Sequence, residues 1–214
     1  MSITERILFL KQFRENFLLT GSVTPSSRFL AKAIISEFVK HQKPSVILEV
    51  GPGTGVFTRE LAINMKPGDT LYVCEINPVF ADNISQFIQT HPDFKSVRGQ
   101  IKIINKPLQE LNDMAAFDYI ISSLPMNNFD VKLVLDIHSY FRTNLKPEGT
   151  LSYFEYIGVR RVRSYLGKKE ERMKLRELDK VLRDFVKKNE YKHEWVPFNI
   201  LPAHVRHLRF NKTN

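Results

Sequence analysis

The chain has 214 residues, of which 43% are hydrophobic and 26% charged, so it is long enough for one substantial α/β domain and has the composition of a soluble globular protein. Its 32 basic and 23 acidic side chains give a formal charge of +9, which favours a polyanionic partner, either nucleic acid or an anionic lipid surface. The sequence predicts no membrane-spanning helix, no secretory signal peptide and, with Cys74 as its single cysteine, neither a disulfide nor a metal site.

The beginning of the chain predicts an amphipathic helix. Ser2 and Glu5 have the spacing of a capping box, in which each side chain satisfies a free backbone N–H group. Apolar residues follow at helical spacing: Ile3, Ile7, Leu10, Phe13 and Phe17. Such a helix either packs against the protein core or lies on a membrane.

The stretch "LTGSVTPSS" interrupts this pattern, and a second helix is expected after it. Thr24 suits an N-cap and Pro25 the first helical position, and the helix would continue to about Lys40. We therefore divide the chain into residues 1–24, an amphipathic helix with a lid segment, and residues 25–214, the main domain.

Strand and helix patterns then alternate along the chain. Strand-type runs cover residues 45–50, 70–76, 101–105, 117–124 and 149–157. Helical patterns run from a glycine-rich turn to Met65, from about Pro78 to Gln89, and from about Asp130 to Asn144. This alternation predicts a mostly parallel sheet with helices on both faces.

The end of the chain departs from that alternation. A charged helix is expected from about Lys169 to Lys188, followed by two strand-type segments, "HEWVPFNI" and "AHVRHLRF". Two neighbouring strands joined by a tight turn with Pro202 predict an antiparallel pair at the sheet edge. Five parallel strands and a terminal hairpin give a Rossmann-like, seven-stranded sheet, which is the layout of the class I S-adenosylmethionine-dependent methyltransferase fold.

The motif "VILEVGPGTGVFTREL" predicts a nucleotide-type cofactor site between a strand and a helix. Gly51, Gly53 and Gly55 form the turn, where side chains would keep a ligand away from the backbone. Glu49, just before the first glycine, suits the cationic methionine end of S-adenosylmethionine but would repel the pyrophosphate of a dinucleotide. We count Thr54, within the turn, among the predicted contacts, and prefer S-adenosylmethionine to NAD.

Two further strand ends contribute to the predicted cofactor site. Glu75 ends the second strand, where a carboxylate can accept both hydroxyl groups of a ribose, and Ile76 follows it. Asn105 ends the third strand, where an amide oxygen can accept a hydrogen bond from an adenine amino group, and Lys106 follows it.

The stretch "FDYIISSLPMNNF" predicts the site of the methyl acceptor. A short loop of Ser122, Ser123, Leu124 and Pro125 follows a buried strand, and such loops hold the target nitrogen in amino-group methyltransferases. The hydroxyl groups and a backbone carbonyl could accept hydrogen bonds from a neutral amine. Where enzymes that methylate adenine have an aromatic residue after the proline, this chain has Met126, which offers no stacking surface for a flipped base.

The fifth strand contributes one more candidate. Tyr153 could contact a methylated ammonium group through its ring, or orient an amine or phosphate through its hydroxyl. For His204 and His207, in the last strand, a structural role is favoured over catalysis.

The sequence resembles the bacterial phospholipid N-methyltransferases, which convert phosphatidylethanolamine stepwise towards phosphatidylcholine and are similar to rRNA adenine dimethylases in their core. The resemblance covers nearly the whole chain and lies in "NFLLTGSVTPSSRFLAKAI", "VILEVGPGTGVFT", "IISSLPM" and "FNILPAHVRHLRF". It implies that Glu49, Gly51, Gly53, Gly55 and Glu75 contact the cofactor, that residues 122–125 hold the target amine, and that the N-terminal helix docks on an anionic membrane. The chain departs from the family at Ser123, where glycine is usual, and at Asn105, where aspartate is usual.

The distribution of charge agrees with a membrane surface. Between Arg160 and Lys192 there are 13 basic and 6 acidic residues, a net +7. We therefore expect a monomeric enzyme in the cytoplasm, peripheral on the inner face of the cytoplasmic membrane, that methylates phosphatidylethanolamine without metal or nucleic acid. Two alternatives remain open: an RNA or DNA adenine-amino methyltransferase, and a membrane- and cofactor-binding protein without catalysis.

Overall fold

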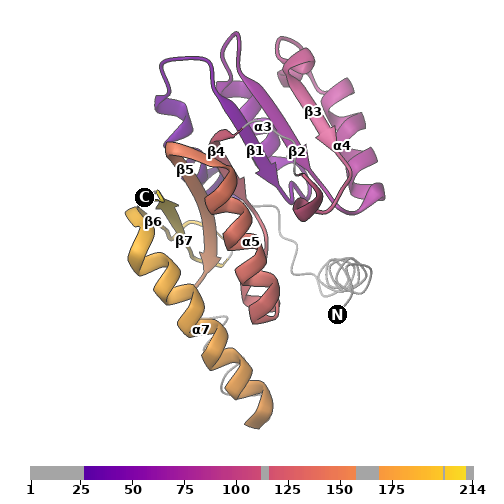
Figure 1. Cartoon of the computed structure of the whole chain (residues 1–214). Helices are drawn as coiled ribbons and strands as arrows, with labels where there is room; N and C mark the ends of the chain where they lie inside the picture. The colour runs from indigo at the N-terminus through magenta and orange to yellow at the C-terminus, as the bar shows by residue number, and fades with distance from the viewer. Residues whose placement is uncertain (1–26, 112–115, 158–168, 200, 211–214) are drawn as a thin grey trace.

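The strands form a single seven-stranded sheet in the order β3-β2-β1-β4-β5-β7-β6 (Figure 1). The structure is a computed structural model, which describes residues 27–111, 116–157, 169–199 and 201–210. The strands are β1 (Val46–Val50), β2 (Thr70–Cys74), β3 (Ile101–Ile104), β4 (Phe117–Ser122), β5 (Leu145–Tyr156), β6 (Glu190–Val196) and β7 (Ala203–Leu208). β1 to β5 pair in parallel, and β7 pairs antiparallel with both β5 and β6, which confirms the predicted fold class.

Helices cover both faces of this sheet (Figure 1). The α-helices are α2 (Arg28–Ile34), α3 (Val56–Asn64), α4 (Pro78–Thr90), α5 (Val131–Asn144) and α7 (Lys169–Asn189). Short 3-10 helices are η1 (Phe38–Lys40), η2 (Pro92–Phe94), η3 (Arg98–Gln100), η4 (Leu108–Glu110) and η5 (Met126–Asn128). None of the helices in the described ranges has the length and apolar character needed to cross a bilayer.

Two apolar cores result, one on each face of the sheet. α2, α3 and α4 pack on one face, against residues such as Ile47 and Ile121. α5 and the buried stripe of α7 pack on the other face, against residues such as Leu48 and Ile120. Because adjacent residues of a strand point to opposite faces, both faces of the central strands are apolar, as the continuous hydrophobic runs predict.

The second helix differs from the prediction. It begins at Arg28 rather than after Thr24 and Pro25, since the Ser27 hydroxyl accepts a hydrogen bond from the backbone N–H of Leu30 at 3.2 Å. The backbone N–H of Ser27 in turn donates to Asn199 Oδ1 at 2.9 Å. This long-range contact, which the local sequence does not reveal, supports Ser27 as the cap. The helix also ends earlier than predicted, at Ile34, and η1 follows as a separate element.

The fifth strand also begins earlier than predicted, at Leu145 instead of residue 149. Leu145 pairs with Phe117, and the register then shifts before Thr150 pairs with Tyr119. The irregular stretch contains Glu148 with φ +63°. The predicted N-terminal helix and the proposed boundary at residue 24 lie outside the described residues.

Candidate active site

The glycine turn between β1 and α3 has the backbone conformation that the sequence predicts. Gly51, Gly53 and Gly55 all have positive φ values, of 72°, 61° and 81°. The Gly51 amide donates to Cys74 O at 3.0 Å, which fixes the turn to the end of β2. A Cβ on Gly55 would lie 2.8 Å from Ile84 Cδ1 and 3.1 Å from Phe87 Cδ1, so a side chain here would have to displace these residues in addition to straining the backbone.

The cofactor turn and the acceptor loop approach each other directly. A Cβ on Gly51 would lie 3.3 Å from Leu124 Cδ2. The Ser123 amide donates to Val50 O at 2.9 Å, continuing the β1–β4 pairing beyond the strand end. Parallel pairing therefore brings two segments more than 60 residues apart in the sequence to one edge of the sheet.

Glu49 is completely buried at this edge, and neither of its oxygens has a hydrogen-bond partner in the described part of the chain. Burial raises the pKa of Glu49 to about 8. The Thr58 hydroxyl and amide lie near the carboxyl group, outside hydrogen-bond geometry, and oppose the increase in pKa, whereas the Glu75 carboxylate adds to it. A cation beside Glu49 would favour its ionised form. Two buried acceptor oxygens at the glycine turn therefore fit the positively charged end of S-adenosylmethionine.

Glu75 and Asn105 lie together at the next two strand ends. The Glu75 carboxylate accepts the Asn77 amide at 2.9 Å, and Asn77 caps α4. The Asn105 side-chain nitrogen donates to Glu75 O at 2.7 Å, which directs its Oδ1 away as a possible acceptor. Asn105 and Lys106 are exposed, and Ile76 is half-buried between Glu75 and Asn77.

In the acceptor loop, the two serines differ. The Ser122 side chain is buried, and its hydroxyl accepts the Leu124 amide weakly, at 3.4 Å. The Ser123 hydroxyl is buried and makes no hydrogen bond to any described residue. The Leu124 carbonyl accepts the Met126 amide at 2.9 Å, and Pro125 is half-buried. Ser123 therefore offers the hydroxyl best placed for a ligand.

The large side chains that follow the acceptor loop are buried. Met126 and Phe129 are only 5% and 4% exposed, because both belong to the core under α5. Tyr153 is also buried and pairs in register with Ser122 and with Arg206. Phe154, on the opposite face of the sheet, packs against Phe57 of α3 with ring centroids 5.8 Å apart.

The structure adds residues that the sequence analysis missed. Thr58 Oγ1 and Asn127 Oδ1 are buried without a hydrogen-bond partner among the described residues. Thr58 lies in the first turn of α3, close enough to Glu49 to influence its pKa. The sequence could have indicated Thr58, because it is a polar residue on the apolar side of a predicted helix, between Phe57 and Leu61.

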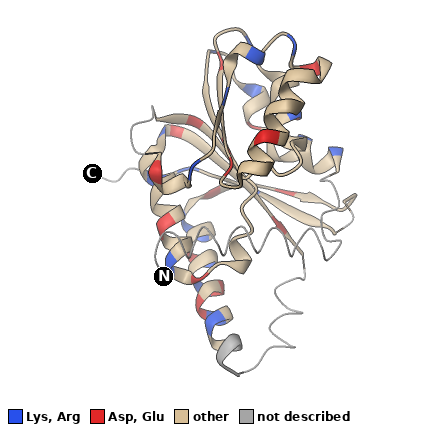
Figure 2. Cartoon of the chain, turned by 90° about the vertical axis from the view of Figure 1, so that its right-hand side faces the viewer, with Lys and Arg blue, Asp and Glu red and all other residues tan. Residues whose placement is uncertain are grey.

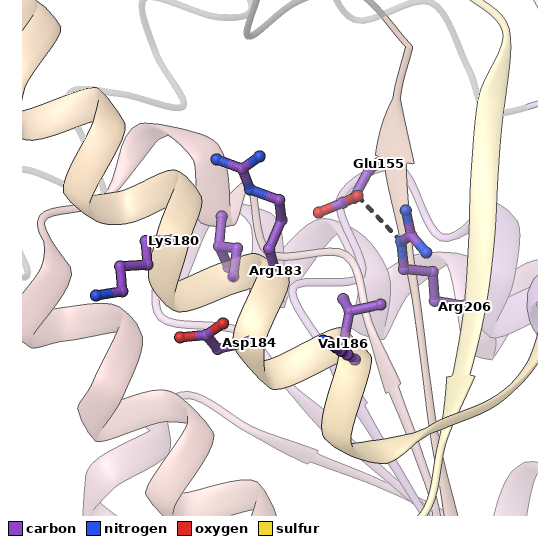
Figure 3. Close-up of a pocket in the computed structure, with 8 residues that line it drawn as sticks. Glu155, Lys180, Arg183, Asp184, Val186 and Arg206 are labelled. Carbon is purple, nitrogen blue, oxygen red and sulfur yellow. Dashed lines mark hydrogen bonds and ion pairs between the residues drawn. The ribbon is translucent and has the colours of Figure 1, made fainter.

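A separate groove of about 460 Å³ lies beside α7 and contains none of the predicted site residues (Figure 3). It is lined by Glu155, Lys180, Leu182, Arg183, Asp184, Val186, Lys187 and Arg206. Arg206 donates to Glu155 at 3.1 Å and to Glu190 at 2.6 Å, so its charge is compensated. The groove opens between α7 and the terminal hairpin rather than at the glycine turn.

Several solved structures that share this fold are methyltransferases. An O-methyltransferase from Bacillus cereus in complex with SAH superposes with a TM-score of 0.66 at 13% identity, over 96% of this chain and 90% of that one. The N-methyltransferase NodS from Bradyrhizobium japonicum WM9, in complex with S-adenosyl-L-homocysteine, gives 0.62 at 13% identity, over 87% and 89%. The fold is that of the class I methyltransferases. These relatives indicate S-adenosylmethionine as the cofactor, as the glycine turn predicts.

Sequence comparison identifies a relative that methylates a lipid. An ornithine lipid N-methyltransferase from Singulisphaera acidiphila is 28% identical over 145 residues, which are 68% of this chain and 74% of that protein. The resemblance to bacterial lipid N-methyltransferases is thus confirmed. No model of a protein family matches the chain. The individual site residues, including Thr54, Ile76, Lys106 and Tyr153, stay predictions.

Proposed function

We propose that this methyltransferase uses S-adenosylmethionine to methylate the head-group amine of a membrane lipid, and that phosphatidylethanolamine and its partly methylated forms are its substrates. The observation that supports this most is the junction of the two loops, where Leu124 Cδ2 of the acceptor loop lies 3.3 Å from the position that a Cβ on Gly51 would occupy. One site can therefore hold both cofactor and acceptor. The similarity to an ornithine lipid N-methyltransferase supports a lipid amine as the acceptor.

In this site, Glu49 and the backbone of the glycine turn would hold the cationic end of S-adenosylmethionine, and Glu75 its ribose. The cofactor supplies an electrophilic methyl group on a sulfonium. The chain must then present a nitrogen with a free lone pair. For an alkylamine with a pKa near 10.4, deprotonation at pH 7 costs about 4–5 kcal/mol.

The acceptor loop is suited to lower that cost. A buried amine loses the hydration that stabilises its charged form, which shifts the equilibrium towards the neutral form. The Ser123 hydroxyl, which has no other partner in the described chain, can accept an N–H of this neutral amine. The Leu124 carbonyl keeps a second lone pair beyond its bond to Met126.

The same loop disfavours a nucleobase. An adenine taken out of a helix is normally stacked on an exposed aromatic ring. Met126 gives no such ring, and Phe129 is buried in the core under α5. We therefore rank the adenine-methylating alternative below the lipid one.

We further propose that the enzyme works on the inner face of the cytoplasmic membrane, held there by residues 1–24 and by the basic segment from Arg160 to Lys192. Within that segment, Arg176, Lys180, Arg183 and Lys187 follow one exposed stripe of α7. Figure 2 presents Lys and Arg interspersed with Asp and Glu along this helix. Each well-placed cation would contribute about 1 kcal/mol at an anionic surface, so binding should weaken as salt is added.

A competition assay tests the proposal. The protein and labelled S-adenosylmethionine are mixed with vesicles of anionic lipid that contain phosphatidylethanolamine, ornithine lipid or neither, with total RNA in every tube. We expect label in the phosphatidylethanolamine fraction, identified by mass. At a limiting concentration of S-adenosylmethionine, Glu49→Gln should strongly reduce the labelling, and Glu60→Gln, a matched change at a half-exposed position on α3, should not.

The other outcomes separate the alternatives. Label in ornithine lipid alone would keep lipid N-methylation and replace the substrate. Label in RNA alone would refute the lipid proposal in favour of base methylation. Cofactor binding without any methylated product would support the non-catalytic alternative.

A further inference from the structure

In the described part of the chain, large apolar side chains are exposed at the tip of the terminal hairpin, close in sequence to both predicted membrane contacts. Five large side chains there are 40–74% exposed. They are Phe29, Ile157, Trp195, Phe198 and Leu201, and we call them the hairpin-tip patch. Phe29 lies in the first turn of α2, Ile157 directly follows β5, Trp195 lies near the end of β6, and the other two residues lie in the β6–β7 connection.

These segments are held together by specific contacts. The rings of Phe29 and Phe198 lie 5.9 Å apart. The Ile157 amide donates to Pro202 O at 2.9 Å, and Asn199 bridges the Ser27 amide and the Leu201 carbonyl. These contacts join the segments of Phe29, Ile157, Phe198 and Leu201. Trp195 pairs with His204 and, next to buried Val196, faces away from α2, so the hairpin tip exposes apolar side chains on both faces of the sheet.

The area of the patch favours a membrane surface over another protein as its partner. Taking about 200 Å² for each large side chain, the exposed fractions leave roughly 550 Å² of apolar area. That lies near the upper end of the roughly 300–600 Å² of the largest apolar patch on a typical monomer, which is often functional, and falls short of the roughly 800 Å² that each partner buries in a stable protein interface.

The charges around the patch are basic. Arg28 and Lys32 are exposed beside Phe29 and form no ion pair within the described ranges. The carboxylates of the hairpin are neutralised: Glu190 pairs with Arg206 at 2.6 Å, and Glu194 pairs with Lys192 at 2.6 Å. A phenylalanine beside cations that have no ion pair in the described ranges, with a tryptophan exposed at the same hairpin tip, suits the interface of a bilayer that contains anionic lipid.

The patch also lies at the edge of the sheet where the acceptor loop opens. β5 runs parallel to β4, and Tyr153 pairs with Ser122 at the start of that loop. Ile157 is four residues further in the same direction, about 13 Å at 3.3 Å per residue. A bilayer that contacts the patch would thus meet the molecule at its acceptor-binding edge.

We propose that the hairpin-tip patch is a membrane-docking surface, which inserts Trp195 and Phe198 into the interface of an anionic bilayer and turns the acceptor loop towards it. The orientation rests on the proposed lipid substrate, whereas the docking itself does not. Residues 1–24 and α7 would then supply additional attraction.

Trp195 is the single tryptophan of the chain, so it reports on the patch directly. The full-length protein is titrated with vesicles of phosphatidylcholine and phosphatidylglycerol, which contain no aminolipid. We expect the Trp195 emission to shift to shorter wavelength, and brominated acyl chains in the same vesicles to quench it. Phe198→Ser should weaken vesicle binding about tenfold, and Ile63→Ser, at an apolar position on α3 that is 51% exposed, should leave it unchanged.

Three results would overturn the proposal. The protein could sediment with vesicles while Trp195 emission stays constant, which would place docking elsewhere. The emission could already be at short wavelength without lipid and independent of protein concentration, which would mean that residues 1–26 cover the patch. A short-wavelength emission that shifts on dilution would instead identify a second copy as the occupant.

Activity distinguishes this proposal from the proposed function. Methylation of a dispersed short-chain aminolipid by both wild type and Phe198→Ser, with loss of activity only on vesicles, supports both proposals. Emission that responds to vesicles without methylation of any lipid refutes the function and retains the docking surface. Methylation of a lipid without any change in Trp195 emission supports the proposed function and refutes the docking surface.

Discussion

The parallel half of the sheet and the terminal hairpin treat their buried polar groups in opposite ways. At the ends of β1 and β4, Glu49 and Ser123 are buried without hydrogen-bond partners in the described chain. In the hairpin, buried His207 contacts Ser152 at 2.8 Å and Glu194 at 3.0 Å. An unsatisfied buried polar group costs about 1–3 kcal/mol, so a fold retains several in one place mainly where a ligand satisfies them.

In the hairpin, both ring nitrogens of His207 have hydrogen-bond partners. Burial lowers the pKa of His207, so the ring is neutral at physiological pH. A carboxylate only accepts, so Nε2–H donates to Glu194 and Nδ1 accepts from the Ser152 hydroxyl. With both nitrogens engaged by described residues, His207 is satisfied within the fold, in agreement with the structural role that the sequence analysis favours. Among the described residues, the comparison therefore favours the parallel half as the place of ligand chemistry.

The largest expected effect is at Glu49. Glu49→Gln removes the charge that would contact the cationic end of the cofactor, and hydrogen bonds to charged groups contribute about 1.5–3 kcal/mol. We expect the affinity for S-adenosylmethionine to fall about 10- to 100-fold in calorimetry, while the apoprotein unfolds at an equal or higher temperature. Unchanged affinity in this variant would remove Glu49 from the cofactor site.

A change at His207 tests the other half of the comparison. His207→Ala leaves Ser152 and Glu194 without a shared partner, which should lower the free energy of unfolding by about 1–3 kcal/mol. In urea titration, His204→Ala on the same strand should have a much smaller effect, because His204 is half-exposed. The folded His207 variant should keep its kcat, and a large loss of kcat without loss of stability would make His207 catalytic.

The pH dependence of cofactor binding follows from the buried carboxyl. The pKa of Glu49 is raised from 4.5 to about 8 in the folded apoprotein. The neutral carboxyl group is therefore compatible with the folded state below pH 4.5, and the free energy of unfolding of the apoprotein decreases as the pH rises from 4.5 towards 8.

Because the ionised form binds a cation, cofactor affinity should increase with pH, by up to about tenfold per unit below pH 8. Calorimetry in buffers with different ionisation enthalpies should detect proton release near pH 7. Glu49→Gln should abolish this release, and a release that persists in the variant would assign it to another group.

The smallest expected effect is at Ser123. Its hydroxyl has no partner to lose in the described chain, so Ser123→Ala should change the free energy of unfolding by less than about 0.5 kcal/mol. If the hydroxyl binds the acceptor amine, kcat/KM should fall about three- to tenfold, corresponding to one hydrogen bond. Ser96→Ala, on the surface, is the control, and equal kcat/KM in both variants would remove Ser123 from the acceptor site.

Local patterns in the sequence predicted most elements of this fold. The continuous apolar runs at residues 45–50 and 117–124 predicted buried strands because both faces of a central strand pack against helices. The glycine turn could be recognised because positive φ values at Gly51, Gly53 and Gly55 leave little choice of residue. Glu49 stood out because a carboxylate in an apolar strand requires a reason.

Contacts between distant segments decided the rest. The cap of α2 is Ser27 and not Thr24, because Asn199, in the β6–β7 connection, holds the Ser27 amide. The strand order, with β7 between β5 and β6, follows from pairing across the whole chain and not from any local pattern. For the same reason, the pairing of Ser122 with Tyr153, the approach of Leu124 to Gly51 and the assembly of the hairpin-tip patch belong to the tertiary structure.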